Sequence, residues 1–234
     1  MIEPVAAPSP VPAVAPWRVR DAVVALGAGL LASVVGALLV SSDGLSTIEL
    51  FSLVLPLQSA GTLFVAYRMA RRRGPVRRVL GLRGRWIDLV GLAVGAGIQI
   101  AGSAVAVSIV ETFFDGEVPG QDLVAIADKP MDATVRVLVV IGLVILGPIA
   151  EEVVFRGMLL PALLPRGRRA AVILSSVIFA LIHLVDPSAA FSIPFLFVLA
   201  LVLANARLRT GGLGRPIAIH AGFNLVTVIA VFVA

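Results

Sequence analysis

Long stretches of apolar residues, separated by short polar segments, dominate the sequence. Seven such stretches occur, at residues 22–40, 45–67, 87–110, 134–164, 170–185, 189–206 and 217–234. A helix needs about 20 apolar residues to cross the ~30 Å hydrocarbon core of a bilayer, and several stretches reach that length. All seven are longer than a transmembrane β-strand, which takes about 10 residues. The pattern predicts an all-α, multi-spanning bundle of about seven transmembrane helices.

The composition agrees with a membrane protein. Hydrophobic residues make up 59% of the chain and charged residues 14%, and the mean hydropathy is +1.04. Ordinary soluble domains contain about 45–50% hydrophobic residues and about 25% charged residues. A water-soluble globule is therefore excluded, and so is a disordered chain, which requires low hydrophobicity. The absence of cysteine excludes disulfides, thiolate metal sites and a cysteine nucleophile.

The basic residues indicate how the chain is oriented. The net charge is +5, and all but one of the 19 basic residues are arginines clustered between apolar stretches. Such clusters are typical of cytoplasmic loops beside anionic lipids, so we expect no nucleic-acid partner. If the amino terminus is cytoplasmic, the segments left outside, near 41–44, 111–133 and 186–188, contain no arginine. We therefore expect a multi-pass protein of the cytoplasmic membrane with its amino terminus inside, and the Arg-rich, Lys-poor composition favours a bacterial source.

Three regions are expected along the chain. Residues 1–16 contain five prolines and predict a disordered Pro-rich cytoplasmic tail. Residues 17–133 carry N-terminal transmembrane helices, and residues 134–234 carry the last four spans.

Glycines within the spans predict close helix packing. The pairs Gly91–Gly95 and Gly97–Ala101 have the small-xxx-small spacing of helix contacts in membranes. The short run from Gly27 to Gly29 resembles part of a dinucleotide-binding fingerprint, but it lies inside a span without a preceding strand. We interpret it as packing.

Three charged residues, Glu151, Glu152 and Arg156, lie well inside the fourth stretch. Each costs ~2.5–3.5 kcal/mol at the centre of a membrane helix, so they must face a polar interior. Glu152 and Arg156 are four positions apart on one helix face, which predicts an ion pair. Glu151 points elsewhere on the helix and is left to act on a water molecule. The alternative is a purely structural ion pair that locks two helices.

Both histidines of the chain also lie in apolar stretches. His183 follows Phe179 by one turn, and Asn224 follows His220 by one turn on the same face. Glu151 and His183 lie at a similar depth, ~20 Å from the cytoplasmic ends of their spans. His220 is closer to the end of its span, so the Gly-rich segment 209–216 must dip inward for a shared site. A histidine that only bridges two helices by a hydrogen bond is the alternative.

Taken in order, these residues resemble the motifs EExxxR, FxxxH and HxxxN of the CPBP family, the CAAX prenyl endopeptidase and bacteriocin-processing (Abi) membrane proteases. The resemblance covers roughly residues 134–228 and includes the flanking sequences FRGMLLPAL and TGGLGRPIAIH. The matching residues are Glu151, Glu152, Arg156, Phe179, His183, His220 and Asn224.

The resemblance implies an intramembrane endopeptidase with its catalytic membrane core at residues 134–234. Its partners would be the bilayer and a membrane-presented polypeptide substrate. It implies that Glu151 is the general base for water, assisted by His183, and that His220 and Asn224 stabilise the oxyanion. The family is also described as metalloproteases, so Zn²⁺ held by Glu151, His183 and His220 stays open. We expect no obligatory metal.

Two other functions remain open at this stage. One is a non-catalytic membrane scaffold or immunity protein that keeps the helix bundle and binds a partner. The other is a proton-coupled transporter with a Glu/His relay, although such transporters often have paired broken helices that are not evident here.

Overall fold

The computed structural model describes residues 17–40, 44–113, 132–185 and 191–233. The predicted tail at 1–16 and most of the acidic segment 111–133 lie outside these residues. The described residues form helices and no strands, which confirms the all-α prediction. The α-helices are α1 (Val19–Val40), α2 (Thr47–Arg71), α3 (Val76–Leu80), α4 (Val90–Phe113), α6 (Ala133–Val140), α7 (Gly147–Val154), α8 (Leu160–Leu163), α9 (Arg168–Ile182), α10 (Ile193–Thr210) and α11 (Gly214–Val233).

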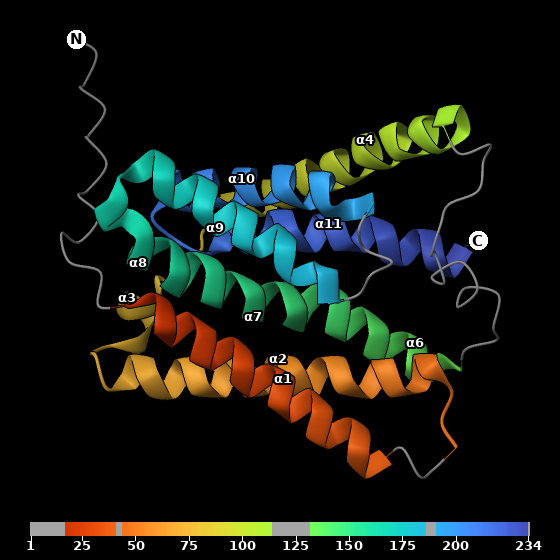
Figure 1. Cartoon of the computed structure of the whole chain (residues 1–234), viewed down its shortest axis with the longest axis horizontal. Coiled ribbons are helices and arrows are strands. Elements are labelled where there is room, and N and C mark those ends of the chain that lie inside the picture. The colour runs from red at the N-terminus through yellow and green to blue at the C-terminus, as the bar shows by residue number, and fades with distance from the viewer. Residues whose placement is uncertain (1–16, 41–43, 114–131, 186–190, 234) are drawn as a thin grey trace.

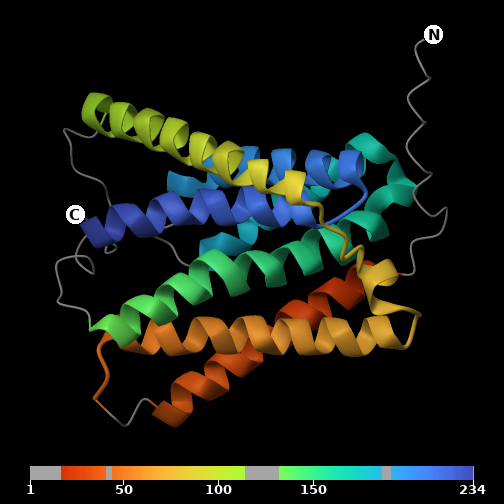
Figure 2. The ribbon, with the colours of Figure 1, turned by 180° about the vertical axis from the view of Figure 1, so that it is seen from behind.

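The helices are arranged in layers around one central helical run (Figures 1 and 2). Helices α6, α7 and α8 and the π-helical segments between them form this run. On one side it packs against α1 and α2, and on the other it faces α9, α10 and α11. Helix α4 lies outermost and packs mainly along α11. The predicted charged cluster of the fourth stretch therefore lies in the middle layer.

Five helical segments are long and apolar enough to cross a membrane, among the residues that the structure describes. They are Val19–Val40, Thr47–Arg71, Trp86–Phe113, Ala133–Arg166 and Ile193–Thr210. The multi-spanning bundle is thus confirmed. The predicted stretches 170–185 and 217–234 coincide with α9 and α11, and a total of seven spans stays a prediction.

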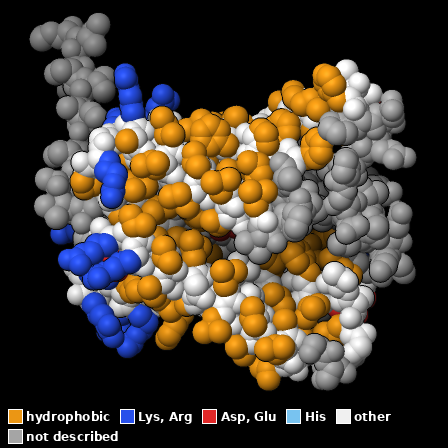
Figure 3. All heavy atoms as spheres, viewed as in Figure 1, with side chains coloured by type: hydrophobic (Ala, Val, Ile, Leu, Met, Phe, Trp, Pro, Cys, Tyr) orange, Lys and Arg blue, Asp and Glu red, His pale blue; other side chains and the backbone are white. Residues whose placement is uncertain are grey.

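One end of the molecule is basic and its flank is apolar. Figure 3 shows arginine side chains gathered at the end where α3 and α8 lie, while hydrophobic side chains are spread over the rest of the described surface in this view. We call this the basic end. This separation is what insertion into a bilayer requires, although which side of the membrane the basic end faces stays a prediction.

Glycines set the closest helix crossings, as their spacing predicts. A Cβ on Gly95 would collide with the backbone of Ile219 and Phe223, and one on Gly222 would collide with the backbone of Leu92. Helices α4 and α11 therefore touch through their backbones. A Cβ on Gly97, by contrast, would have no atom within 4 Å, so among the described residues Gly97 makes no close helix contact.

The crossing of α1 and α2 follows the same rule. A Cβ on Gly29 would meet Gln58 and Thr62, and one on Gly61 would meet Ala28 and Ala32. The packing interpretation of Gly29 is therefore confirmed, whereas Gly27 has no neighbour within contact distance.

At the basic end, the segment around Gly81 and the segment before α11 are joined by backbone hydrogen bonds. Leu213 N–H donates to the Gly81 carbonyl at 3.0 Å, and Gly214 N–H donates to the Arg83 carbonyl at 2.9 Å. The Leu213 side chain is buried within the bundle. The Gly-rich segment is thereby held against residues 81–83, and α11, which begins at Gly214, packs against α7. That the segment dips inward stays a prediction.

Candidate active site

The glutamate pair lies on α7, between two π-helical segments. Ile141–Leu146 precedes α7, and Phe155–Leu159 follows it and contains Arg156. π-Helical turns inside α-helices are rare and occur often at functional sites. Each adds a residue to a turn and so changes which side chains share a face.

Glu152 and Arg156 form the predicted ion pair, and it is fully buried. Arg156 Nη1 donates to Glu152 Oε1 at 2.9 Å, and the two side chains are 1% and 0% exposed. Arg156 Nη2 donates to the Ala200 carbonyl of α10 at 3.1 Å. The guanidinium carbon lies 4.5 Å from the centre of the Phe179 ring. The cation is thus compensated by a carboxylate, a carbonyl and an aromatic face, which makes its burial tolerable.

His220 joins the two glutamates. Its Nδ1 lies 3.0 Å from Glu152 Oε1, the same oxygen that accepts from Arg156. An oxygen paired with an arginine is a carboxylate acceptor, so Nδ1 of His220 carries a proton. The other ring nitrogen, Nε2, lies 3.8 Å from Glu151 Oε2. Glu152 therefore fixes the ring so that Nε2 faces Glu151.

Glu151 differs from Glu152 in its surroundings. Its side chain is 30% exposed, whereas that of Glu152 is fully buried. Oε2 of each glutamate is buried and accepts no hydrogen bond from the described residues. Arg156 therefore holds Glu152, as the helical spacing predicts, while Glu151 lies 3.8 Å from His220 Nε2, and its action on a water molecule stays a prediction.

His183 lies at the end of α9, next to Phe179. Its Nδ1 lies 2.8 Å from the Phe179 carbonyl, which accepts the Nδ1 proton and leaves Nε2 unengaged by that bond. Its ring centroid is 5.0 Å from that of Phe179, and the ring of His220 is 5.7 Å from the same phenyl group. Both imidazoles therefore contact one buried aromatic ring. No hydrogen bond joins His183 to either glutamate within the described part of the chain.

Asn224 is engaged with the backbone of the central run. Its Nδ2 donates to the Leu143 carbonyl at 2.8 Å. This contact ties α11 to the first π-helical segment, one turn beyond His220. The sequence identified Asn224 as a site residue, but it gave no signal for this partner, because a main-chain carbonyl has no side-chain signature.

The three-ligand zinc site left open by the resemblance does not fit the arrangement. Among the described residues, no three or more histidine, aspartate and glutamate side chains are grouped so that they could hold a metal ion. Glu151, His183 and His220 therefore do not form such a group, and we derive no step through a metal. The expectation that no metal is obligatory stays a prediction.

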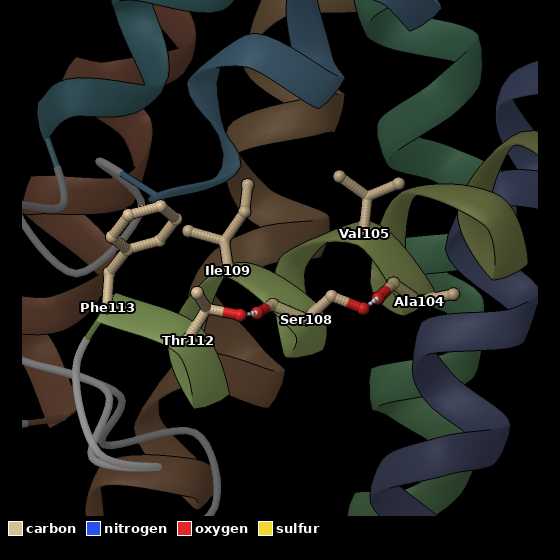
Figure 4. A pocket seen from close by; sticks show the side chains of 6 residues that line it. All are labelled: Ala104, Val105, Ser108, Ile109, Thr112 and Phe113. Atoms are coloured by element: carbon tan, nitrogen blue, oxygen red, sulfur yellow. Dashed lines mark hydrogen bonds between the residues drawn. The ribbon is translucent and has the colours of Figure 1, made fainter.

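A shallow hollow of about 400 Å³ lies elsewhere, on the outer face of α4 (Figure 4). Its lining comes from α4 alone: Ala104, Val105, Ser108, Ile109, Thr112 and Phe113. The two hydroxyl groups donate to carbonyls one turn earlier, those of Ala104 and Ser108. Its polar groups are therefore satisfied within the helix, and none of its lining residues belongs to the glutamate–histidine cluster.

Comparison with known proteins identifies one match. Residues 133–226 match the family model described as type II CAAX prenyl endopeptidase Rce1-like. No curated protein and no solved structure matches the chain significantly. The matched segment contains all seven residues that carry the three motifs and coincides with the region of the CPBP resemblance, which the match supports over these residues.

Proposed function

From the Rce1-like type II CAAX prenyl endopeptidase domain at residues 133–226, we propose that this protein hydrolyses a peptide bond of a membrane-associated protein or peptide. The family supports an intramembrane endopeptidase. The observation that carries the specific proposal is the buried chain from Arg156 through Glu152 and His220 to Glu151, because it leaves one carboxylate and one ring nitrogen facing each other without a direct hydrogen bond.

Charge balance supports the division of roles. With both glutamates ionised and His220 protonated, the two negative and two positive charges of the cluster cancel. Burying a neutral set costs far less than burying a net charge. In that state Glu151 is a base, and Nε2 of His220 is a donor.

In the proposed reaction, Glu151 accepts a proton from a water molecule as its oxygen attacks the substrate carbonyl. Nε2–H of His220 stabilises the negative charge that develops on the carbonyl oxygen. The proton taken by Glu151 passes to the leaving amine as the C–N bond breaks, so that a carboxylic acid and an amine result. The 3.8 Å separation of Glu151 Oε2 and His220 Nε2 is longer than a hydrogen bond, so neither atom's bonding capacity is taken up by the other.

The remaining groups position these two. Glu152 holds the His220 ring and stabilises its imidazolium form, and Arg156 holds Glu152. We propose that His183, whose Nδ1 is fixed on the Phe179 carbonyl, assists Glu151 through Nε2. Phe179 keeps both imidazoles beside the cluster.

Cleavage of defined peptides tests the proposal. Purified protein is reconstituted into vesicles with a set of single-span peptides, and products are identified by mass spectrometry in ¹⁸O-labelled water. We expect one ¹⁸O atom in the new carboxyl group. Glu151→Gln should lower the rate by roughly 10²–10⁴-fold, the usual contribution of a general base. Glu111→Gln, an exposed glutamate on α4, is the matched control.

Two results would overturn the proposal. Cleavage at the wild-type rate by Glu151→Gln would exclude Glu151 as the base. A biological effect that is unchanged in both Glu151→Gln and His183→Ala would favour the non-catalytic scaffold or immunity protein.

A further inference from the structure

Two prolines leave two backbone carbonyls of the central run without helical donors. In the first π-helical segment, Gly147 N–H bonds to the Gly142 carbonyl, so the next carbonyl, that of Leu143, would pair with residue 148. Residue 148 is proline and has no N–H. The Leu143 carbonyl therefore has no donor within its own helix.

The second π-helical segment repeats this arrangement. Leu160 N–H bonds to the Phe155 carbonyl, so the Arg156 carbonyl would pair with residue 161. Residue 161 is also proline. On either side of the glutamate pair, one carbonyl thus lacks a helical donor because the residue five positions later is proline.

Each freed carbonyl is taken by a side chain from another helix. Asn224 Nδ2 of α11 donates to Leu143 at 2.8 Å, and Arg207 Nε of α10 donates to Arg156 at 3.2 Å. Both hydrogen bonds are part-buried, and a carbonyl shielded from water is costly to leave without a donor. The two side chains therefore satisfy carbonyls that the helix itself does not.

Arg207 also completes a reciprocal contact between Arg156 and α10. The Arg156 side chain donates to the Ala200 carbonyl, and the Arg156 carbonyl accepts from Arg207, two turns further along the same face of α10. Gly81, with φ +72°, leaves room for the guanidinium, since a Cβ there would collide with it. Residue 156 is therefore fixed by both its side chain and its backbone.

We propose that Asn224 and Arg207 are positioning residues that hold the glutamate-bearing helix against α11 and α10 through the carbonyls freed by Pro148 and Pro161. Asn224 sets the depth of His220 beside Glu151, and Arg207 fixes the turn that presents Arg156 to Glu152. This assignment rests on the proposed endopeptidase activity, and it gives Asn224 a role different from direct stabilisation of the oxyanion.

A double-mutant cycle between Pro148 and Asn224 tests the first contact. Alanine at 148 supplies an N–H that competes with Asn224 for the Leu143 carbonyl. We expect Asn224→Leu to lower kcat about tenfold, the effect of losing one buried hydrogen bond, with KM unchanged. Pro148→Ala should also lower kcat, and the double variant should stay within about twofold of Asn224→Leu, because both changes break the same contact.

Matched controls and a readout independent of catalysis accompany the cycle. Asn205→Leu removes an asparagine whose one side-chain hydrogen bond to the described residues is to the Leu201 carbonyl of its own helix, and this variant should retain wild-type kcat. Thermal unfolding in detergent is measured for every variant, and Asn224→Leu should lower Tm less in the Pro148→Ala background than alone. This second readout decides the assignment even if Glu151→Gln shows that the proposed activity is wrong.

The second contact is tested in the same way at Arg207. Arg207→Leu should lower kcat about tenfold with unchanged KM, whereas Arg207→Lys, whose ammonium reaches the same carbonyl, should retain most of the rate. Arg209→Leu, exposed at the same helix end, is the control. Equal losses from Asn224→Leu with and without Pro148→Ala, with Pro148→Ala at the wild-type rate, would overturn the assignment of Asn224. Equal losses in the leucine and lysine variants would overturn that of Arg207.

Discussion

Replacing Arg156 by methionine isolates the energetic role of the buried ion pair. Methionine fills a similar volume but removes the cation, the hydrogen bond to the Ala200 carbonyl and the contact with the Phe179 ring. Glu152 then remains 0% exposed, with His220 as its one remaining polar contact among the described residues. The change therefore leaves a buried carboxylate without its principal partner.

The size of the effect follows from that burial. Removing one partner of a buried ion pair costs ~3–5 kcal/mol. A protein of 150–250 residues loses about 2–4 °C in Tm for each kcal/mol, so Arg156→Met should lower Tm by about 6–20 °C. Adding Glu152→Gln removes the stranded charge and should restore most of the Tm, because an amide oxygen still accepts from His220 Nδ1.

Thermal unfolding and peptide cleavage, measured on the same detergent-solubilised samples, separate stability from activity. We expect the double variant Glu152→Gln/Arg156→Met to regain stability but not activity, since a neutral residue 152 no longer stabilises the imidazolium form of His220. Arg166→Met, an exposed arginine at the basic end, is the control. A wild-type Tm for Arg156→Met would refute the reasoning, and so would full activity of the double variant.

Two further predictions concern packing around the site. Gly95→Val should lower the free energy of unfolding by about 1–3 kcal/mol, because the new side chain must displace the backbone of α11. The control Gly97→Val should change Tm little. Equal Tm values in the two variants would contradict the backbone contact between α4 and α11. Phe179→Ala should lower the free energy of unfolding by about 3–5 kcal/mol and abolish most of the cleavage activity, because Arg156 and both imidazoles lose the ring that they contact. Phe113 is exposed, so Phe113→Ala should behave as wild type in the same unfolding and cleavage assays.

Much of the architecture could be predicted because membranes impose a simple rule on sequence. Backbone groups in hydrocarbon must be satisfied within a helix, so apolar length alone locates spans such as 134–164. The cost of buried charge identified Glu151, Glu152 and Arg156 as interior groups, and helical spacing predicted the Glu152–Arg156 pair. Glycine spacing likewise predicted a close helix contact at Gly91 and Gly95, and the structure makes it with α11.

What the sequence did not provide was the partner of each side chain across helices. Depth counted along each helix suggested Glu151 beside His183, whereas the structure places His220 Nε2 at 3.8 Å from Glu151. Depth along the helix axis gives only the height of a side chain. The direction in which it points around the axis depends on the number of residues per turn between it and a reference residue. The two π-helical segments change that number, and periodicity assuming a regular helix cannot detect them. The acceptors of Asn224 and Arg207 are carbonyls, which every residue has.

The crossing of α4 and α11 has a consequence for how this protein can be recombined. The segment that matches the family begins at residue 133, yet α11 meets a helix encoded before that point, backbone against backbone at Gly95 and Gly222. Helix α4 can therefore not be exchanged independently of α11, because their backbones are in contact. A chimera that takes α4 from a relative would need small residues opposite Gly222. Otherwise α11, which carries His220, could not pack as closely as it does here.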